Sequence, residues 1–235
     1  MIQIAALVSP VGSSEEEFSI SSLIDRLSSE RSPEGRRDPA VRGLVVSEVF
    51  KYLTETKDVK AMIQLWWDVP AVGPEGIGRI LPDVSPGTSF RAEAFVVKEH
   101  VFREPVEREQ PDGSDKGVKL AGTAYRRDDF SREAFFEYWS DVHAPISGSV
   151  PGLGGYVVSE ILESLSGTSS ADALLELWWP DEATFERSGD SPKQAEAWED
   201  VGRYAKTTGT FWLMREHVLI APPPTGPGLL EVDHA

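Results

Sequence analysis

Residues 130–162 read FSREAFFEYWSDVHAPISGSVPGLGGYVVSEIL. Residues 18–50 align with them at a shift of 112 without a gap and read FSISSLIDRLSSERSPEGRRDPAVRGLVVSEVF. Ten of the 33 aligned positions are identical, whereas unrelated segments would share about two. The same shift places Leu65–Trp67 over Leu177–Trp179, and Glu99–Val101 recurs as Glu216–Val218 after five extra residues. Duplication of one unit accounts for this pattern.

Each copy has the pattern of a β-α-β-β-α-β unit, the ferredoxin-like order. The expected strands are Ile2–Val8, Gly43–Val49, the run ending in Trp67 and Phe95–Phe102 in the first copy, and Val118–Tyr125, Gly155–Ile161, the run ending in Trp179 and Phe211–Ile220 in the second. A sheet of this kind has one face covered by helices and one bare face. Two copies can bury their bare faces against each other, so the sequence predicts an α+β fold in which two repeats form a pseudo-dimeric α+β barrel within one chain.

The expected boundaries follow from composition. The first repeat covers residues 1–102 and the second covers residues 118–220. The segment between them, residues 103–117, is charged and contains Gly and Pro, as linkers often do, and residues 221–235 are expected to form an extended tail.

Helix signals are clearer in the second copy than in the first. Ser131 can cap the N-terminus of the first helix, Pro145 is expected to end it, and Ser191-Pro192 is a favourable start for the second helix. In the first copy the second helix should be short, because glycines and a proline crowd it: Gly73, Pro74, Gly76 and Gly78.

Composition excludes several classes of function. The chain has no cysteine, so disulfides, thiolate metal sites and a cysteine nucleophile are excluded. The formal net charge of −16 opposes binding to nucleic acid or to an anionic membrane, and there is neither an 18-residue apolar run nor a secretory signal. We therefore expect a cytoplasmic protein whose partner is a small molecule or a second copy of itself in a homodimer.

The candidate functional residues lie on one helix. Phe135, Trp139 and His143 are spaced i, i+4 and i+8, so they share a helical face, with Tyr138 at its edge. A face this apolar normally packs in the core, and a histidine at a helix end is favoured by the helix dipole. A purely structural role is therefore one interpretation of these residues.

Comparison of the copies favours a functional role. The first copy has Arg26-Leu27, Arg31 and Leu44 where the second has Tyr138-Trp139, His143 and Tyr156, whereas the prolines, a glycine and the Val-Val-Ser-Glu run are kept in both. Packing alone would require the aromatic residues in both copies. By the same reasoning the histidines that recur in both copies, His100 and His217, are expected to be structural.

The second copy resembles the EthD domain of the dimeric α+β barrel superfamily. The resemblance rests on FSREAFFEYW, HAP and PGLGGYVVSE, followed by LELWWPD and a last strand with Glu-His-Val. It implies cofactor-independent chemistry on aromatic or polyketide-like molecules, namely decarboxylation, dehydration, cyclisation or lactone isomerisation. Related barrels include cofactor-free monooxygenases and haem enzymes.

The resemblance makes His143 the candidate general acid/base. An imidazole titrates near pH 6.5 and so can transfer protons near neutrality, an effect typically worth ~10²–10⁴ in rate. Asp141 is a weak candidate for orienting it. The candidate substrate-binding residues are Phe135, Tyr138, Trp139, Tyr156, Trp178 and Trp179. Only one of Trp178 and Trp179 can line a given cleft, because neighbours on a strand point to opposite faces.

The expected function is that of a cofactor-independent lyase, dehydratase, cyclase or decarboxylase of polyketide-type metabolism, working by His acid/base catalysis. One alternative is a cofactor-free monooxygenase on a similar substrate, and another is a non-catalytic protein that binds small molecules. No dinucleotide, P-loop or Gly-x-Ser-x-Gly motif is present, and no His/carboxylate cluster predicts a metal, so we expect no metal or other cofactor.

Overall fold

The structure is a computed structural model that describes residues 2–10, 19–29, 40–55, 58–68, 90–105, 117–165, 169–206 and 209–223. Its strands are β1 (Ile2–Pro10), β2 (Val41–Tyr52), β3 (Ala61–Trp67), β4 (Phe90–Arg103), β5 (Val118–Ala124), β6 (Gly155–Ser164), β7 (Ala173–Trp179) and β8 (Phe211–Ile220). Its helices are α1 (Ile20–Ser29), α3 (Arg132–Tyr138), α4 (Ala144–Gly148), α5 (Glu182–Gly189) and α6 (Pro192–Tyr204), with a π-helical turn, η3 (Trp139–His143), between α3 and α4. The expected second helix of the first repeat, and most of the linker and tail, lie outside the described residues.

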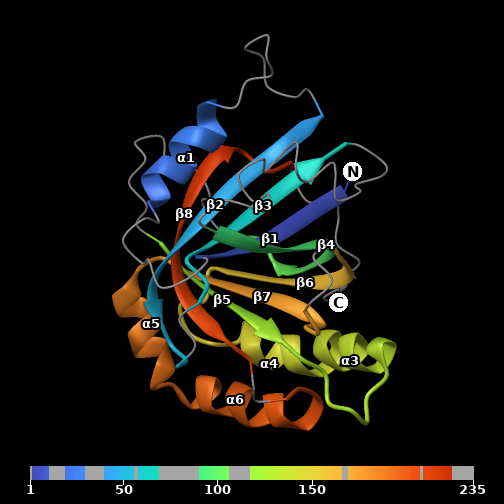
Figure 1. The fold of residues 1–235 in the computed structure, drawn as a ribbon. Coiled ribbons are helices and arrows are strands. Elements are labelled where there is room, and N and C mark those ends of the chain that lie inside the picture. The colour runs from blue at the N-terminus through green and yellow to red at the C-terminus, as the bar shows by residue number, and fades with distance from the viewer. Residues whose placement is uncertain are drawn as a thin grey trace.

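The strands close into a barrel in the order β1-β3-β2-β8-β5-β7-β6-β4 (Figure 1). Within each half the order is the same, β4-β1-β3-β2 in the first and β8-β5-β7-β6 in the second. The register is also equivalent, because Ile4 lies opposite Leu65 and Leu120 lies opposite Leu177. The predicted fold, two ferredoxin-like repeats in one intrachain barrel, is confirmed.

The two repeats are joined by pairing between the edge strands of their sheets. Strand β4 of the first repeat pairs with β6 of the second, and β8 of the second pairs with β2 of the first, both antiparallel. Each repeat therefore supplies the strand that completes the edge of the other, which leaves no open edge between them.

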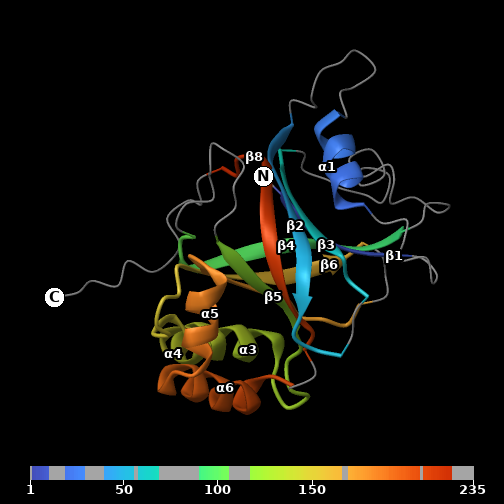
Figure 2. The same ribbon diagram turned by 90° about the vertical axis from the view of Figure 1, so that its left-hand side faces the viewer.

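Alternating side chains divide the barrel wall into two faces. In β1, Ile4, Ala6 and Val8 belong to an outer cluster that packs with α1, whereas Ala5 and Leu7 belong to a cluster in the barrel interior. Figures 1 and 2 show α1 on one side of the barrel and α3, α4, α5 and α6 on another, with α6 furthest from the strands. In the part of the chain that the structure describes, no helix is long and apolar enough to cross a membrane.

The barrel interior also contains a polar network. The Lys119 ammonium donates to Glu176 and to Glu216 over 2.9 Å each, and to the Gln64 carbonyl oxygen over 3.2 Å. The Gln64 amide donates to Glu176 over 3.1 Å. Gln64 and Glu176 are equivalent under the shift of 112, so their contact marks the pseudo-twofold axis between the repeats.

Each repeat also has a glycine against which a proline packs that follows the last strand of the other repeat. A Cβ on Gly43 would lie 2.8 Å from Cα of Pro222, which follows β8. A Cβ on Gly155 would lie 2.7 Å from Cα of Pro105, which follows β4. Both distances are shorter than any normal Cβ contact, so these positions require glycine for close approach of the backbones.

Candidate active site

The segment that carries the candidate residues is one helical stretch with a widened turn. Ser131 caps α3 by accepting from the backbone N–H of Ala134, as predicted. The prediction that Pro145 ends the helix is wrong, because the chain continues as α4 beyond η3. The π-helical turn finishes at His143, and Pro145 is the second residue of α4.

The end of α4 is held by the other repeat. Arg103, at the end of β4, donates to the carbonyl oxygens of Gly148 and Leu153. The first repeat thus supports the helix that carries the candidate residues. A single π-helical turn within an α-helix is a feature often found at functional sites.

His143 is buried and hydrogen-bonded at both ring nitrogens. Its side chain is 6% exposed. Nδ1 lies 3.0 Å from Oδ2 of Asp200, which comes from α6, and Nε2 lies 2.8 Å from the hydroxyl oxygen of Ser147, one turn further along α4. The imidazole is therefore fixed between a carboxylate and a hydroxyl group.

Asp200 is itself enclosed by partners. The Tyr138 hydroxyl donates to Oδ1 of Asp200 over 2.8 Å, and the guanidinium of the exposed Arg203 lies 3.6 Å from the same oxygen. Asp200 is 2% exposed. A buried carboxylate requires such partners, and here they leave each carboxylate oxygen with a hydrogen-bond donor.

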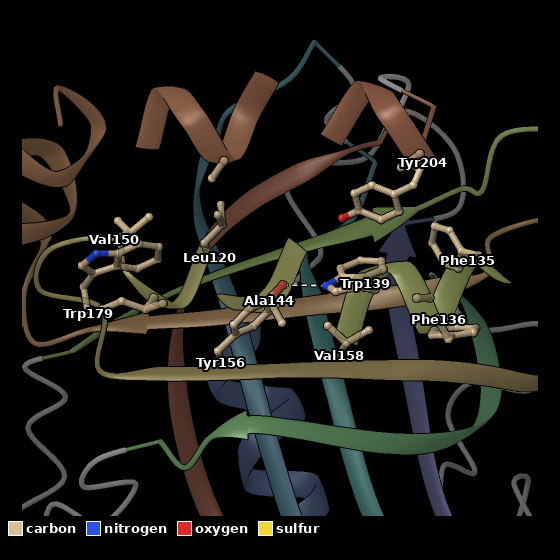
Figure 3. Packing of buried hydrophobic residues seen from close by; sticks show 14 of the residues in the cluster. Leu120, Phe135, Phe136, Trp139, Ala144, Val150, Tyr156, Val158, Trp179 and Tyr204 are labelled. Atoms are coloured by element: carbon tan, nitrogen blue, oxygen red, sulfur yellow. Dashed lines mark hydrogen bonds between the residues drawn. The ribbon is translucent and has the colours of Figure 1, made fainter. Parts of the chain in front are cut away.

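Aromatic rings surround this group. Trp139 packs edge-on against both Phe135 and His143, with ring centroids 5.3 and 5.9 Å apart. The Tyr204 ring, from α6, lies 5.0 Å from His143 and stacks on Tyr138 at 5.1 Å. Figure 3 shows Tyr204 reaching from α6 towards Trp139.

Tyr156 joins the group from the sheet. Its hydroxyl oxygen accepts a hydrogen bond from Nε1 of Trp139 over 2.6 Å, the dashed line in Figure 3, and also interacts with Ser147. We refer to this set as the His143 cluster: Tyr138, Trp139, His143, Ser147, Tyr156, Asp200 and Tyr204.

Burial sets the protonation states in the His143 cluster. Desolvation lowers the pKa of His143, although Asp200 acts in the opposite direction. Desolvation also raises the pKa values of Tyr138, Tyr156 and Tyr204. At neutral pH the imidazole is therefore uncharged and the three phenols keep their protons.

The candidate residues from the sequence divide into two groups. Phe135, Tyr138, Trp139 and Tyr156 lie around His143 in one core cluster. Trp179 belongs to the same core cluster, where it packs edge-on against Phe185 of α5.

Trp178 is placed elsewhere. It points to the opposite side of β7 from Trp179, where the Lys119 ammonium lies 5.5 Å from its ring centroid. Trp178 therefore faces the polar network of the barrel interior and does not join the His143 cluster.

Sequence reasoning missed Asp200, Ser147 and Tyr204. Two signals were available. Asp200 and Tyr204 share the buried face of α6 with Ala197, and a carboxylate on an apolar helical face needs a partner. Ser147 follows His143 by four residues, one helical turn.

Asp141, proposed as a weak candidate for orienting His143, is exposed, and the carboxylate beside the imidazole is that of Asp200.

The two recurring histidines lie at the junctions between repeats. Nε2 of His100 lies 2.9 Å from Glu160, across the β4–β6 pair, and Nε2 of His217 lies 3.6 Å from Glu48, across the β8–β2 pair. The pKa of Glu160 is lowered by its hydrogen bonds to His100 and Arg132, which outweigh desolvation. Among the described residues, no group of three or more His, Asp or Glu side chains is arranged to hold a metal ion.

Comparison with known proteins relates this geometry to a family. The model of the EthD domain matches residues 127–208, a range that contains the whole His143 cluster. A comparison with curated proteins found no match.

Solved structures resemble the whole barrel. An anthrone oxidase-like protein superposes with a TM-score of 0.59 at 11% identity, covering 93% of each chain. A proposed monooxygenase from Fusobacterium nucleatum gives a TM-score of 0.53 at 9% identity, covering 96% of each chain. A proposed chlorite dismutase gives 0.54 at 12% identity, covering 93% of this chain and 96% of the other. At such low identity, these TM-scores show similarity of fold alone.

The fold, an α+β barrel formed within one chain, is shared with these solved structures, which include proteins proposed to be enzymes. The EthD domain model matches most of the second repeat, including the whole His143 cluster.

Proposed function

We propose that the protein is a cofactor-independent acid–base enzyme of lyase or cyclase type, in which His143 removes and returns a proton on an aromatic or polyketide-like hydrophobic substrate. The observation that carries this proposal is the imidazole of His143, uncharged at neutral pH and held between Asp200 and Ser147. Dehydration, cyclisation and decarboxylation of such substrates all require a proton to be moved at a defined position.

The surrounding groups suit this chemistry. A base with a lowered pKa is free of its proton at neutral pH, and the imidazolium formed during the reaction would lie beside the Asp200 carboxylate. Tyrosine hydroxyls that stay protonated can donate to an enolate or phenolate oxygen. The rings of Trp139, Tyr138 and Tyr204 pack together and make the surroundings of His143 aromatic, an environment that suits a flat aromatic molecule.

The test uses 5-nitrobenzisoxazole, a flat aromatic probe whose ring opens when a base removes its C–H proton. We expect the protein to accelerate ring opening above the buffer rate, and His143→Gln to lower that acceleration by roughly 10²-fold or more. Arg31→Ala, at the equivalent position of the first repeat, should leave the rate unchanged. If both wild type and His143→Gln accelerate ring opening equally above the buffer rate, the assignment of His143 is refuted. If neither exceeds the buffer rate, the non-catalytic binding protein is favoured.

A second candidate is a cofactor-free monooxygenase. It is favoured by the similarity to an anthrone oxidase-like protein over 93% of the chain. The first step would be the same proton abstraction, and the substrate anion would then reduce O₂. Anthrone in an oxygen-electrode cell separates the two functions. If O₂ uptake matches the loss of anthrone and disappears in His143→Gln, the protein is an oxygenase. If the protein opens the benzisoxazole ring but consumes no O₂ in the presence of anthrone, the lyase is favoured.

A further inference from the structure

Ser147 occupies the hydrogen-bonding position at Nε2 of His143. Both ring nitrogens are already hydrogen-bonded, Nδ1 to Asp200 and Nε2 to Ser147. A substrate that approached Nε2 directly would have to break the bond to Ser147 inside a buried site. Transfer through the Ser147 hydroxyl would preserve both hydrogen bonds.

The direction of the hydrogen bonds is fixed at one end by Asp200. A carboxylate only accepts, so the proton on the uncharged imidazole must lie on Nδ1. Nε2 then carries a lone pair, and the 2.8 Å contact requires Ser147 to donate its hydroxyl proton to it. Tyr138 supports this arrangement by donating to the other oxygen of Asp200.

Trp139 orients the Tyr156 hydroxyl next to this group. An indole N–H only donates, so the Tyr156 oxygen accepts from it and the Tyr156 proton points elsewhere. Ser147 interacts with the Tyr156 hydroxyl. With its proton directed to Nε2, the Ser147 oxygen keeps two lone pairs, either of which can accept a substrate proton.

We propose that Ser147 is a second catalytic residue, a proton relay between the substrate and His143, and that Asp200 is the positioning residue that fixes the relay's direction. This inference rests on the proposed acid–base function. In the forward step the substrate's X–H bond breaks and its proton binds the Ser147 oxygen, while the Ser147 proton passes to Nε2. The products are the substrate anion and an imidazolium paired with Asp200, and the reverse transfer returns a proton to the substrate or leaving group.

The duplication is consistent with this role. The shift of 112 places Gly35 opposite Ser147, just as it places Arg31 opposite His143 and Leu44 opposite Tyr156. The first repeat therefore lacks counterparts of His143, Ser147 and Tyr156. It keeps the strand residues on which the fold depends.

The direction of the relay can be tested without any substrate. In nitrogen-15 NMR spectra, the His143 signals are identified by their loss in His143→Gln. We expect Nδ1 to be protonated and Nε2 unprotonated in the wild type. Ser147→Ala should keep that state and shift the Nε2 resonance, because Nε2 loses its donor. In Asp200→Asn the amide can donate to Nδ1, so the proton should move to Nε2. A wild-type His143 protonated at Nε2 would overturn the relay.

The kinetic test uses 5-nitrobenzisoxazole on the full-length protein. Ser147→Ala should lower the catalysed rate by about 10²-fold, and Ser147→Thr, which keeps a hydroxyl, should recover much of it. Ser149→Ala is the matched control, because this exposed serine only donates to the Ile146 carbonyl. If His143→Gln abolishes the rate and Ser147→Ala preserves it, the relay is wrong and the acid–base function stands. If His143→Gln also preserves it, the proposed function itself has failed.

Discussion

His143 is held in a region where charge is unfavourable, next to a carboxylate that favours it. Burial has the larger effect and lowers the pKa of the imidazole. The sequence suggested a histidine at a helix end, worth about 1 kcal/mol to stability. The structure places it at the centre of a buried network, so removing it would leave Asp200 short of a partner and should cost more, about 1–3 kcal/mol.

The lowered pKa predicts how stability depends on pH. The unfolded chain binds this proton more tightly than the folded protein, so the contribution of His143 is fully present above about pH 6.5 and is lost as pH falls towards the folded-state pKa. We expect the Tm of the wild type to fall more steeply than that of His143→Gln between about pH 7.5 and about pH 5.5. Thermal denaturation of both proteins across this range is the measurement, and parallel curves would contradict it.

At this scale the sequence predicted four members of the His143 cluster, Tyr138, Trp139, His143 and Tyr156, but not Ser147, Asp200 or Tyr204. Phe135, Trp139 and His143 share a helix, so their spacing alone brings them together. Asp200 is 57 residues from His143, and only the packing of α6 on α4 places it beside the imidazole. The spacing of residues along one helix brings them together directly, whereas a partner on another helix is identified only when the packing of the two helices is known.

Among the structural elements, the paired strands of the two repeats determine how the halves fit. Gly155 and Gly43 lie where a proline from the other repeat crosses the strand, and both are kept by the duplication. The sequence showed these glycines as recurring positions. It did not show what approached them, because Pro105 and Pro222 lie beyond the last strand of the opposite repeat.

These contacts predict a pair of destabilising substitutions. Gly155→Ala and Gly43→Ala should each lower the free energy of unfolding by about 1–3 kcal/mol, because the new methyl group would overlap backbone that cannot move freely. Gly202→Ala is the control. Gly202 lies within α6 and has no atom within 4 Å of the added methyl, so this change should raise stability by roughly 0.5–1 kcal/mol. Urea denaturation of the three variants would show whether Gly43→Ala and Gly155→Ala lower the free energy of unfolding while Gly202→Ala does not.

At the scale of the whole molecule, neither repeat is complete without the other. Strands β6 and β8 of the second repeat are paired with β4 and β2 of the first. The strand order and the barrel could be predicted from the repeat, since two bare sheet faces must be buried. The interior polar network could not, because it depends on which side chains meet at the pseudo-twofold axis.

We expect residues 118–220, expressed alone, to associate as a homodimer, because the edges of β6 and β8 would otherwise be open. In that dimer two Glu176 side chains would meet where the intact chain has Gln64 and Glu176, and like charges would repel. Glu176→Gln in the isolated repeat should therefore strengthen the dimer. Sedimentation equilibrium measures both effects, and a folded monomer at all concentrations would show that the repeat is self-sufficient.

The Gln64–Glu176 contact has an evolutionary consequence. In a homodimer each substitution occurs twice, so a residue on the symmetry axis always faces its own copy. Fusion of the two genes removes that constraint, and a glutamine can then face a glutamate and donate to it. Once the two positions differ in this way, separation of the halves would no longer restore two interchangeable subunits. The two halves then depend on being part of one chain, and each half can diverge from the other.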